Sequence, residues 1–343
     1  MRCAAVNKNR SKAQQLAINT GMSLLIPVGL FVIFGILSRG RSFTWAMFMA
    51  TLKQSVTPII ICYGLMLNMS VGMMNFSAGG MILFAGIVGG NLAKNLGLGI
   101  PGMILLCILL CTLEGAATGV LYNVMRVPCI VLSLGMMLIW ESFPKVLYQD
   151  GVNLKANMTT LAKQPYCYMI MLIAFLIFHI LFNYTAFGHN LRALGNNQAI
   201  SISVGLNRDK SKFLSFALGG FFLGIAAFMY ISERGAVRNV ASMGSMTIMM
   251  DGFMGMFIAM FLSRYCNMSV AIILGTFSMK FLSNGFVSLG MSSTVRDIVQ
   301  GLFLLILLTI SANSGYFDRK KADREFAEAC NAAYAKKTAS INS

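Results

Sequence analysis

Six ionisable side chains lie within or at the ends of long apolar stretches of this 343-residue sequence. An ionised group at the centre of a bilayer costs about 3 kcal/mol or more, and such groups mark solute, ion or proton paths by default. Glu114 lies deepest in its apolar stretch. A proton-coupled carrier requires a chain of such groups, and this sequence offers too few to favour that mechanism. The six are Lys53, Glu114, Glu141, Lys145, Asp251 and Lys280.

Polar side chains also gather among glycines near residues 68–80, namely Asn68, Ser70, Asn75 and Ser77. One interpretation is a broken or re-entrant helix, which is tolerated in a membrane only where it is buried in protein or lines a water-filled path. The other is a polar turn that joins two ordinary spans at the membrane interface. These residues alone leave both interpretations open.

Residues that enzymes use for catalysis are scarce. The two histidines, His179 and His189, occur without an HExxH, GxSxG or GxxxxGK[ST] motif. The eight cysteines form no CxxC pair, so we expect neither a disulfide framework nor a zinc site. We predict that the protein is not an enzyme and binds no metal, cofactor or ATP itself. If a nucleotide powers it, the ATPase must be another chain.

The elements that carry these residues are predicted to be membrane-spanning helices. Hydrophobic residues make up 57% of the chain, charged residues only 11%, and the mean hydropathy is +0.72. A spanning helix needs about 20 mostly apolar residues, and continuous apolar runs differ from the short alternating segments of a barrel. The sequence therefore predicts an all-α integral membrane protein with about ten spans. Their windows are centred near residues 28, 57, 85, 111, 137, 174, 222, 254, 277 and 304.

The net charge of +16 is predicted to reflect topology and not nucleic-acid binding, because the basic residues form no stripe with aromatics. They concentrate before the first span, in residues 186–213 and after the last span. Such segments face the cytoplasm by the positive-inside rule. Both termini are then cytoplasmic, which agrees with an even number of spans.

One membrane domain is predicted between two short cytoplasmic segments. Residues 1–16 form a basic N-terminal segment, residues 17–313 the polytopic domain, and residues 314–343 a C-terminal tail. The first apolar run lacks an A-x-A-like cleavage site, so we interpret it as a retained helix. Glycine pairs four residues apart, such as Gly115 with Gly119 and Gly220 with Gly224, predict close helix packing.

The segment of residues 186–213, AFGHNLRALGNNQAISISVGLNRDKSKF, is polar and basic with helical apolar spacing. A chain this apolar has little reason to keep a long loop on one side of a membrane unless a partner docks there. We therefore expect a docking site in it.

Four stretches in a fixed order resemble permease subunits of bacterial ATP-binding-cassette (ABC) importers for ribose, xylose, galactose and related sugars. They are GMMNFSAGG, VPCIVLSLGMMLIWES, FGHNLRALGNNQAISISVGL and FLSNGFVSLGMSSTVRDIVQGLFLLILL. The resemblance runs from about residue 45 to 313. It is specific for the family and not for the sugar.

The resemblance implies that the third stretch is the cytoplasmic coupling segment that sits on the ATP-binding subunit. The residues assigned to that role are Phe187, Gly188, Arg192, Gly195, Asn196, Asn197, Ala199, Val204 and Gly205. For the translocation path we name four polar residues. They are Asn75, Ser77, Asn123 and Asn284.

One residue and one segment depart from the family pattern. Asn75 stands where the family usually has aspartate, which removes a charge from the path. Residues 259–270 read AMFLSRYCNMSV where a glycine-rich region is expected.

The implied mechanism is alternating access in the bacterial inner membrane. Two permease subunits, identical or related, form a central path, and two ATP-binding subunits drive it from the cytoplasm. An extracellular binding protein delivers a monosaccharide-like solute to residues 147–164 and 233–243. Alternatives are an ABC permease for nucleosides or other small polar solutes, an ATP-independent carrier or channel, and an assembly subunit that no longer transports. Membrane lipid is the other expected partner, and nucleic acid is not one.

Overall fold

The computed structural model describes residues 44–125, 127–240, 242–292 and 294–303, with residues 21, 27–29, 305, 306 and 309. The chain divides into two units, residues 1–291 and residues 292–343. The described part of the second unit is helical over residues 294–303. The predicted terminal segments 1–16 and 314–343 lie outside the described residues.

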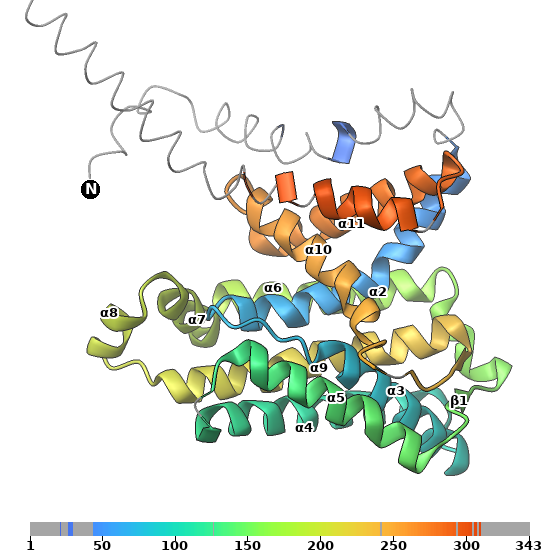
Figure 1. The fold of residues 1–343 in the computed structure, drawn as a ribbon, viewed down its shortest axis with the longest axis horizontal. Helices are drawn as coiled ribbons and strands as arrows, with labels where there is room; N and C mark the ends of the chain where they lie inside the picture. Colours follow the sequence, from blue (N-terminus) through green and yellow to red (C-terminus); the bar gives the residue numbers. More distant parts are fainter. Residues whose placement is uncertain are drawn as a thin grey trace, which may run out of the picture. The chain divides into compact units, whose positions relative to one another are not determined.

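The described part of the first unit is a bundle of helices with one short two-stranded ribbon (Figure 1). Its long helices are α2 (Trp45–Met69), α3 (Ala78–Asn95), α4 (Gly99–Met125), α5 (Cys129–Leu147), α6 (Tyr166–Tyr184), α9 (Arg208–Arg234), α10 (Met246–Leu262) and α11 (Met268–Ser288). Its short elements are the strands β1 (Val152–Asn153) and β2 (Ala236–Val237), the 3₁₀ helix η2 (Ala156–Ala162), α7 (Ala186–Asn196) and α8 (Gln198–Ser203). The all-α prediction is confirmed at this level.

The number of spans is not confirmed. Six described helices are long and apolar enough to cross a membrane, namely α2, α4, α5, α6, α9 and α11. Two further predicted windows fall on α3, with 18 residues, and α10, with 17 residues, which do not meet the same measure. Helix α10 is one residue short of this measure, whereas α3 is long enough but not apolar enough. The windows near residues 28 and 304 fall largely on residues that are not described.

Helices α4 and α9 form a closely packed pair of the unit, and glycine makes their contact possible. A methyl group on Gly115 would overlap the carbonyl oxygen of Phe216, and one on Gly220 would overlap the carbonyl oxygen of Cys111. The glycine pairs identified in the sequence thus bring the two backbones together, as predicted.

Helix α2 stops at Met69 and α3 starts at Ala78, and the chain between them is not helical. Gly72, with φ of 78°, makes the turn that ends α2. Asn75 and Ser77 are 1% and 0% exposed, so this connection returns into the protein. A turn exposed to water would leave such side chains accessible, which these are not; the broken or re-entrant helix near residues 68–80 stays a prediction.

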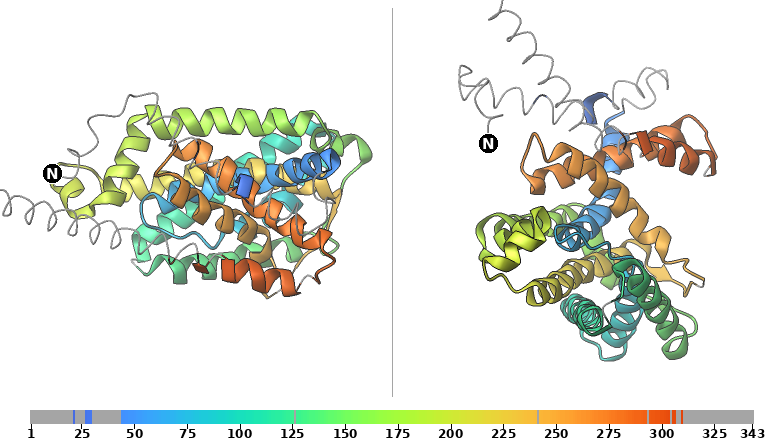
Figure 2. Two further views of the ribbon diagram at one scale, coloured as in Figure 1. Left: turned by 90° about the horizontal axis from the view of Figure 1, so that it is seen from above. Right: turned by 60° about the vertical axis from the view of Figure 1, so that its left-hand side comes forward.

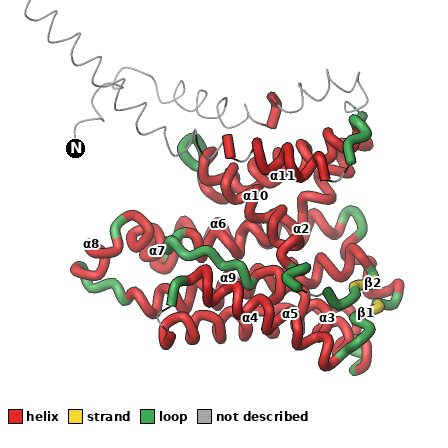
Figure 3. The backbone as a smooth tube through the Cα atoms, viewed as in Figure 1, coloured by secondary structure: helices red, strands yellow, loops and turns green. Residues whose placement is uncertain are grey.

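The first unit carries different elements at its two ends (Figures 1 and 3). At one, which we call the ribbon end, β1 pairs antiparallel with β2 through Val152 and Val237. Asn239 holds the same two segments together by donating to the carbonyl oxygens of Tyr148 and Gln149 at 2.6 and 2.9 Å. At the other lie α7 and α8, and α6 runs between the two ends (Figure 2).

Candidate functional site

A partly open, polar cavity of about 410 Å³ lies toward the ribbon end of the first unit and is lined by α2, α9, α10 and α11. We call it the ribbon-end cavity. Its wall also includes Val240 and Gly244 from the connection that leads into α10. Four helices of one chain therefore supply the walls. The side chains that give it polar character are Gln54, Thr57, Glu233, Arg234, Asp251 and Lys280.

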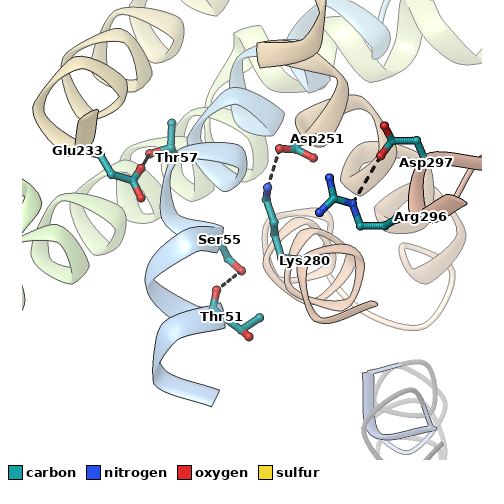
Figure 4. Close-up of polar contacts among 8 residues, drawn as sticks. All are labelled: Thr51, Ser55, Thr57, Glu233, Asp251, Lys280, Arg296 and Asp297. Carbon is teal, nitrogen blue, oxygen red and sulfur yellow. Dashed lines mark hydrogen bonds and ion pairs between the residues drawn. The ribbon is translucent and has the colours of Figure 1, made fainter. Parts of the chain in front are cut away.

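Charged groups in the cavity are held by near neighbours (Figure 4). Lys280 Nζ on α11 lies 2.5 Å from Asp251 Oδ2 on α10. Thr57 Oγ1 on α2 donates to Glu233 Oε2 on α9 across 3.4 Å, a long and therefore weak bond. The Arg234 guanidinium lies 4.4 Å from the centre of the Tyr230 ring. Two carboxylates, an ammonium and a guanidinium thus leave the cavity without formal net charge.

Proline adds a backbone acceptor on the α2 wall. Pro58 lies inside α2 and has no N–H, so the carbonyl of Gln54, one turn earlier, lacks its usual helical donor. Both residues line the cavity. An interrupted hydrogen-bond ladder in a membrane is tolerated where water or a polar solute can satisfy the freed group.

A second cavity of about 450 Å³ lies at the α7–α8 end, where α2, α6, α7 and the α10–α11 connection meet. On α2 the first cavity ends at Ile61 and the second begins at Met66. The residues between them, including Cys62, Tyr63 and Leu65, are buried. A closed layer of protein therefore separates the two cavities along α2.

Glycines on α10 and α11 make that layer tight. A methyl group on Gly252 would overlap the side chain of Ile61, and one on Gly255 would overlap Thr276. We call the buried α2 residues between the two cavities, together with the packing of Gly252 and Gly255 against α2 and α11, the closed layer. These contacts depend on the absence of Cβ atoms, so a larger residue at either position would separate the helices.

Asn75 and Ser77, two of the predicted path residues, are paired with each other. Asn75 Oδ1 accepts from the Ser77 N–H at 3.1 Å and from the Ser77 hydroxyl at 2.6 Å, at the start of α3. A methyl group on Gly79 would overlap the carbonyl oxygen of Ser245, just before α10. The starts of the two short helices α3 and α10 therefore meet inside the bundle. Glu141 accepts from Ser245 at that point.

The other two predicted path residues lie elsewhere. Asn123 Nδ2 donates to the carbonyl oxygen of Asp209 at 3.0 Å and joins the ends of α4 and α9. Asn284 Nδ2 donates to Thr51 Oγ1 at 2.9 Å and joins α11 to α2. The structure brings only Asn75 and Ser77 together, and it leaves a shared path through all four residues as a prediction.

Of the six ionisable residues identified in the sequence, Asp251 and Lys280 line the ribbon-end cavity. Glu114 is buried in α4, and within the described residues neither of its carboxylate oxygens has a hydrogen-bond partner. Sequence reasoning missed Gln54, Thr57 and Glu233, because it considered only charged residues within the predicted spans. Gln54 and Thr57 are uncharged, and Glu233 lies just beyond the window centred near residue 222. The described residues contain no group of three or more metal-ligating side chains.

The predicted coupling segment is two helices with different environments. On α7, Leu191 and Leu194 are buried, and Gly195 lies so close to the end of α2 that a methyl group there would overlap the Ser70 carbonyl oxygen. Gly188 is packed in the same way against the end of α6. Arg192 lies 5.2 Å over the Phe182 ring. Helix α7 is thereby fixed to the ends of two spanning helices.

Helix α8 instead projects from the unit with an apolar surface. Asn197 breaks the helix and caps α8, its Oδ1 accepting from the Ile200 N–H at 3.1 Å. Ile200, Ile202 and Val204 are 61%, 47% and 78% exposed. The apolar residues that the sequence spaces as one helix thus fall into two groups. Leu191 and Leu194 on α7 are buried, whereas those on and just after α8 are exposed. Phe187, Asn196, Ala199 and Gly205 complete the predicted coupling segment around these two helices.

Comparison with known proteins identifies the family. Residues 47–308 match the family described as "Branched-chain amino acid transport system / permease component". The chain belongs to this family. The family-level resemblance drawn from the four sequence stretches is therefore confirmed, and the permease is a multi-pass component of an inner-membrane transport system, not an enzyme.

Curated relatives include two permease proteins from Yersinia. The "Autoinducer 2 import system permease protein LsrC" of Yersinia pseudotuberculosis serotype O:1b (strain IP 31758) is 25% identical over 297 residues, which cover 84% of this chain and 83% of the relative. The protein of the same name from Yersinia pestis (strain Pestoides F) is also 25% identical over 297 residues, with the same coverage. The permease is similar to these import-system proteins over most of its length.

Proposed function

We propose that this permease is the membrane subunit of an ABC importer and moves a monosaccharide-like solute by alternating access. Separate ATP-binding subunits supply the energy from the cytoplasm, and an extracellular binding protein delivers the solute. A second permease subunit, identical or related, completes the membrane part. In this arrangement the α7–α8 end and both termini face the cytoplasm.

The exposed apolar surface of α8 is the observation that carries the proposal. Ile200 and Ile202 lie on the six-residue helix α8, which follows a capped break, and Val204 is the residue that ends this helix. All three side chains are exposed and do not cover the spanning helices. Burying an aliphatic side chain of this kind contributes about 1.5–3 kcal/mol, so three of them make a strong anchor for a partner. These three side chains do not contribute to packing inside the bundle.

The attachment of α7 supports a coupling role for the same segment. Gly195 contacts Ser70 at the end of α2, and the non-helical connection from Ser70 leads directly to Asn75, Ser77 and the start of α3. A push on α8 would therefore act on the interrupted part of the bundle without any intervening loop.

The ribbon end supports delivery of solute from the other side. The two segments proposed to receive a binding protein, residues 147–164 and 233–243, are joined there by the β1–β2 ribbon and by Asn239. They can therefore act as one receiving surface. The printed names of the Yersinia relatives, which are import-system permease proteins, agree with the inward direction.

The test is co-purification of the full-length permease with a candidate ATP-binding subunit from a neighbouring gene. We expect the wild-type pair to form a complex, and Val204→Asp and Ile200→Asp to abolish it. Gly195→Asp and Ala199→Glu should also weaken the complex. Val204→Leu keeps an apolar side chain and Asn157→Asp adds the same charge at the ribbon end, so both should leave association unchanged. Association that is indifferent to the α8 changes would overturn the coupling assignment.

A further inference from the structure

We propose that the ribbon-end cavity is a solute-binding site within a single permease chain, and that it takes a polyhydroxylated solute that carries no charge. This inference rests on the proposed transport function and adds to it a binding site for the solute. It differs from the expectation of a path formed only between two permease subunits, because α2, α9, α10 and α11 of one chain supply the walls.

The size of the cavity suits a small solute. Ligand sites occupy about 300–1,000 Å³, and the 410 Å³ of this cavity corresponds to about fourteen liquid waters at about 30 Å³ each. A single sugar ring with its hydroxyl groups fits within that space.

The charges of the cavity argue against a charged or zwitterionic ligand. Lys280 and Asp251 neutralise each other at 2.5 Å, and Glu233 and Arg234 have neighbours of their own in Thr57 and the Tyr230 ring. Because the formal charges of the cavity cancel, an ionic solute gains no net attraction there, and an ion that paired with Asp251 or Lys280 would compete with their existing contact. A neutral solute can add hydrogen bonds to each charged group and leave the pairs intact.

The hydrogen-bonding groups are of the types that hydroxyl groups require. The carboxylates of Asp251 and Glu233 accept, Lys280 donates, and the Gln54 amide does both. The Gln54 carbonyl freed by Pro58 is a further acceptor. The Thr57–Glu233 bond is long at 3.4 Å, so a solute hydroxyl could take its place at little cost.

The closed layer gives the site a direction. Ile61, which lines the cavity, is packed against Gly252, and Cys62 to Leu65 separate it from the second cavity. A solute in the ribbon-end cavity is therefore blocked from the α7–α8 end in this conformation, as an occluding barrier in alternating access requires.

Thiol protection in membrane vesicles that contain the full-length permease and its ATP-binding subunit tests the inference. Thr247, an exposed residue of the cavity wall, is changed to cysteine and labelled with membrane-impermeant 2-sulfonatoethyl methanethiosulfonate. Leu113→Cys, on the exposed apolar face of α4, is the matched control and should not react, since it faces lipid. The unsubstituted permease gives the background from its eight native cysteines.

We expect Thr247→Cys to react and to be protected by at least one neutral sugar from a panel of D-ribose, D-xylose, D-glucose and D-galactose at millimolar concentration. Leucine as a zwitterion, D-gluconate as an anion and choline as a cation should not protect it. Combining it with Asp251→Asn gives the cavity an uncompensated positive charge, and the apparent affinity for D-gluconate should rise by about tenfold or more. Lys280→Gln should do the same for choline.

Three results would overturn the inference. They are an unreactive Thr247→Cys, protection by no sugar of the panel, and protection by leucine but not by sugars. Failure of the proposed function is a separate result, because it appears as a wild-type permease that does not associate with the ATP-binding subunit. An intact, ATP-hydrolysing complex whose Thr247→Cys ignores every neutral sugar would reject this site and leave the importer assignment standing.

Discussion

Glu141 Oε2 on α5 accepts two hydrogen bonds from Ser245, one from its backbone N–H at 3.2 Å and one from its hydroxyl at 2.7 Å. Ser245 is the residue that precedes α10, so this buried carboxylate lies at the N-terminal end of a helix that begins inside the bundle. Negative charge at a helix start is favourable both for the free N–H groups and for the helix dipole. Glu141 thus stabilises the start of α10 inside the bundle.

Removing that contact should destabilise the permease. Glu141→Ala leaves the Ser245 N–H and hydroxyl buried without their acceptor, at a cost of about 1–3 kcal/mol. Glu141→Gln keeps an acceptor oxygen and should cost less. The midpoint of thermal unfolding of the detergent-solubilised protein measures both. Ser142→Ala, at the next position on the exposed side of α5, loses only a bond to its own helix and is the control. Equal midpoints for Glu141→Ala and Ser142→Ala would contradict the capping role.

Helix contact through glycine predicts a contrast between two alanine substitutions. Gly115→Ala places a methyl group on the Phe216 carbonyl oxygen and should push α4 from α9, at about 1–3 kcal/mol. Gly135→Ala, in α5, meets no atom within 4 Å and should be neutral or stabilising by up to about 1 kcal/mol. Retention of a monodisperse peak after heating separates the two. If Gly135→Ala proved the more harmful, the packing account would be wrong.

The Lys280–Asp251 pair should matter more for transport than for stability. Their side chains are 19% and 46% exposed, and ion pairs with such exposure contribute about 0–1 kcal/mol to stability. Lys280→Gln should therefore shift the unfolding midpoint little, yet reduce ATP-dependent uptake of the sugar that protects Thr247→Cys. Lys94→Gln, which removes a charge at the ribbon end outside the cavity, should leave uptake unchanged. A large loss of stability with normal uptake would show that the pair is structural only.

Cys266, in the connection between α10 and α11, should react slowly with maleimides at neutral pH. Burial raises the pKa of the Cys266 thiol above its ordinary value. The thiolate is the reactive form, so at neutral pH less of it is present than in an unfolded peptide, and the rate should continue to rise above about pH 8.5. Alkylation by N-ethylmaleimide across a pH series, followed by mass spectrometry, measures this. A Cys266 rate that levels off at the same pH as a peptide of the same sequence would refute it.

The all-helical class and most of the element positions could be predicted from sequence, because a bilayer demands long apolar helices whatever the rest of the chain does. The interruption near Asn75 and the separation of residues 186–213 from the spans were also visible as breaks in apolar character. The glycine spacing at Gly115 and Gly220 predicted close helix contact, because the four-residue spacing of two glycines can be recognised within a single helix.

Tertiary structure alone decided what these features meet. Asn75 and Asn284 are both amides near apolar runs, yet one accepts from Ser77 just before α3 and the other joins α11 to α2. Asp251 and Lys280 lie 29 residues apart and form a pair only because α10 and α11 fold back on each other. Gln54, Thr57 and Glu233 become parts of a cavity only when α2 and α9 pack side by side. Periodicity records which face of a helix is apolar, whereas a site depends on contacts between helices, and those are set by packing over the whole bundle.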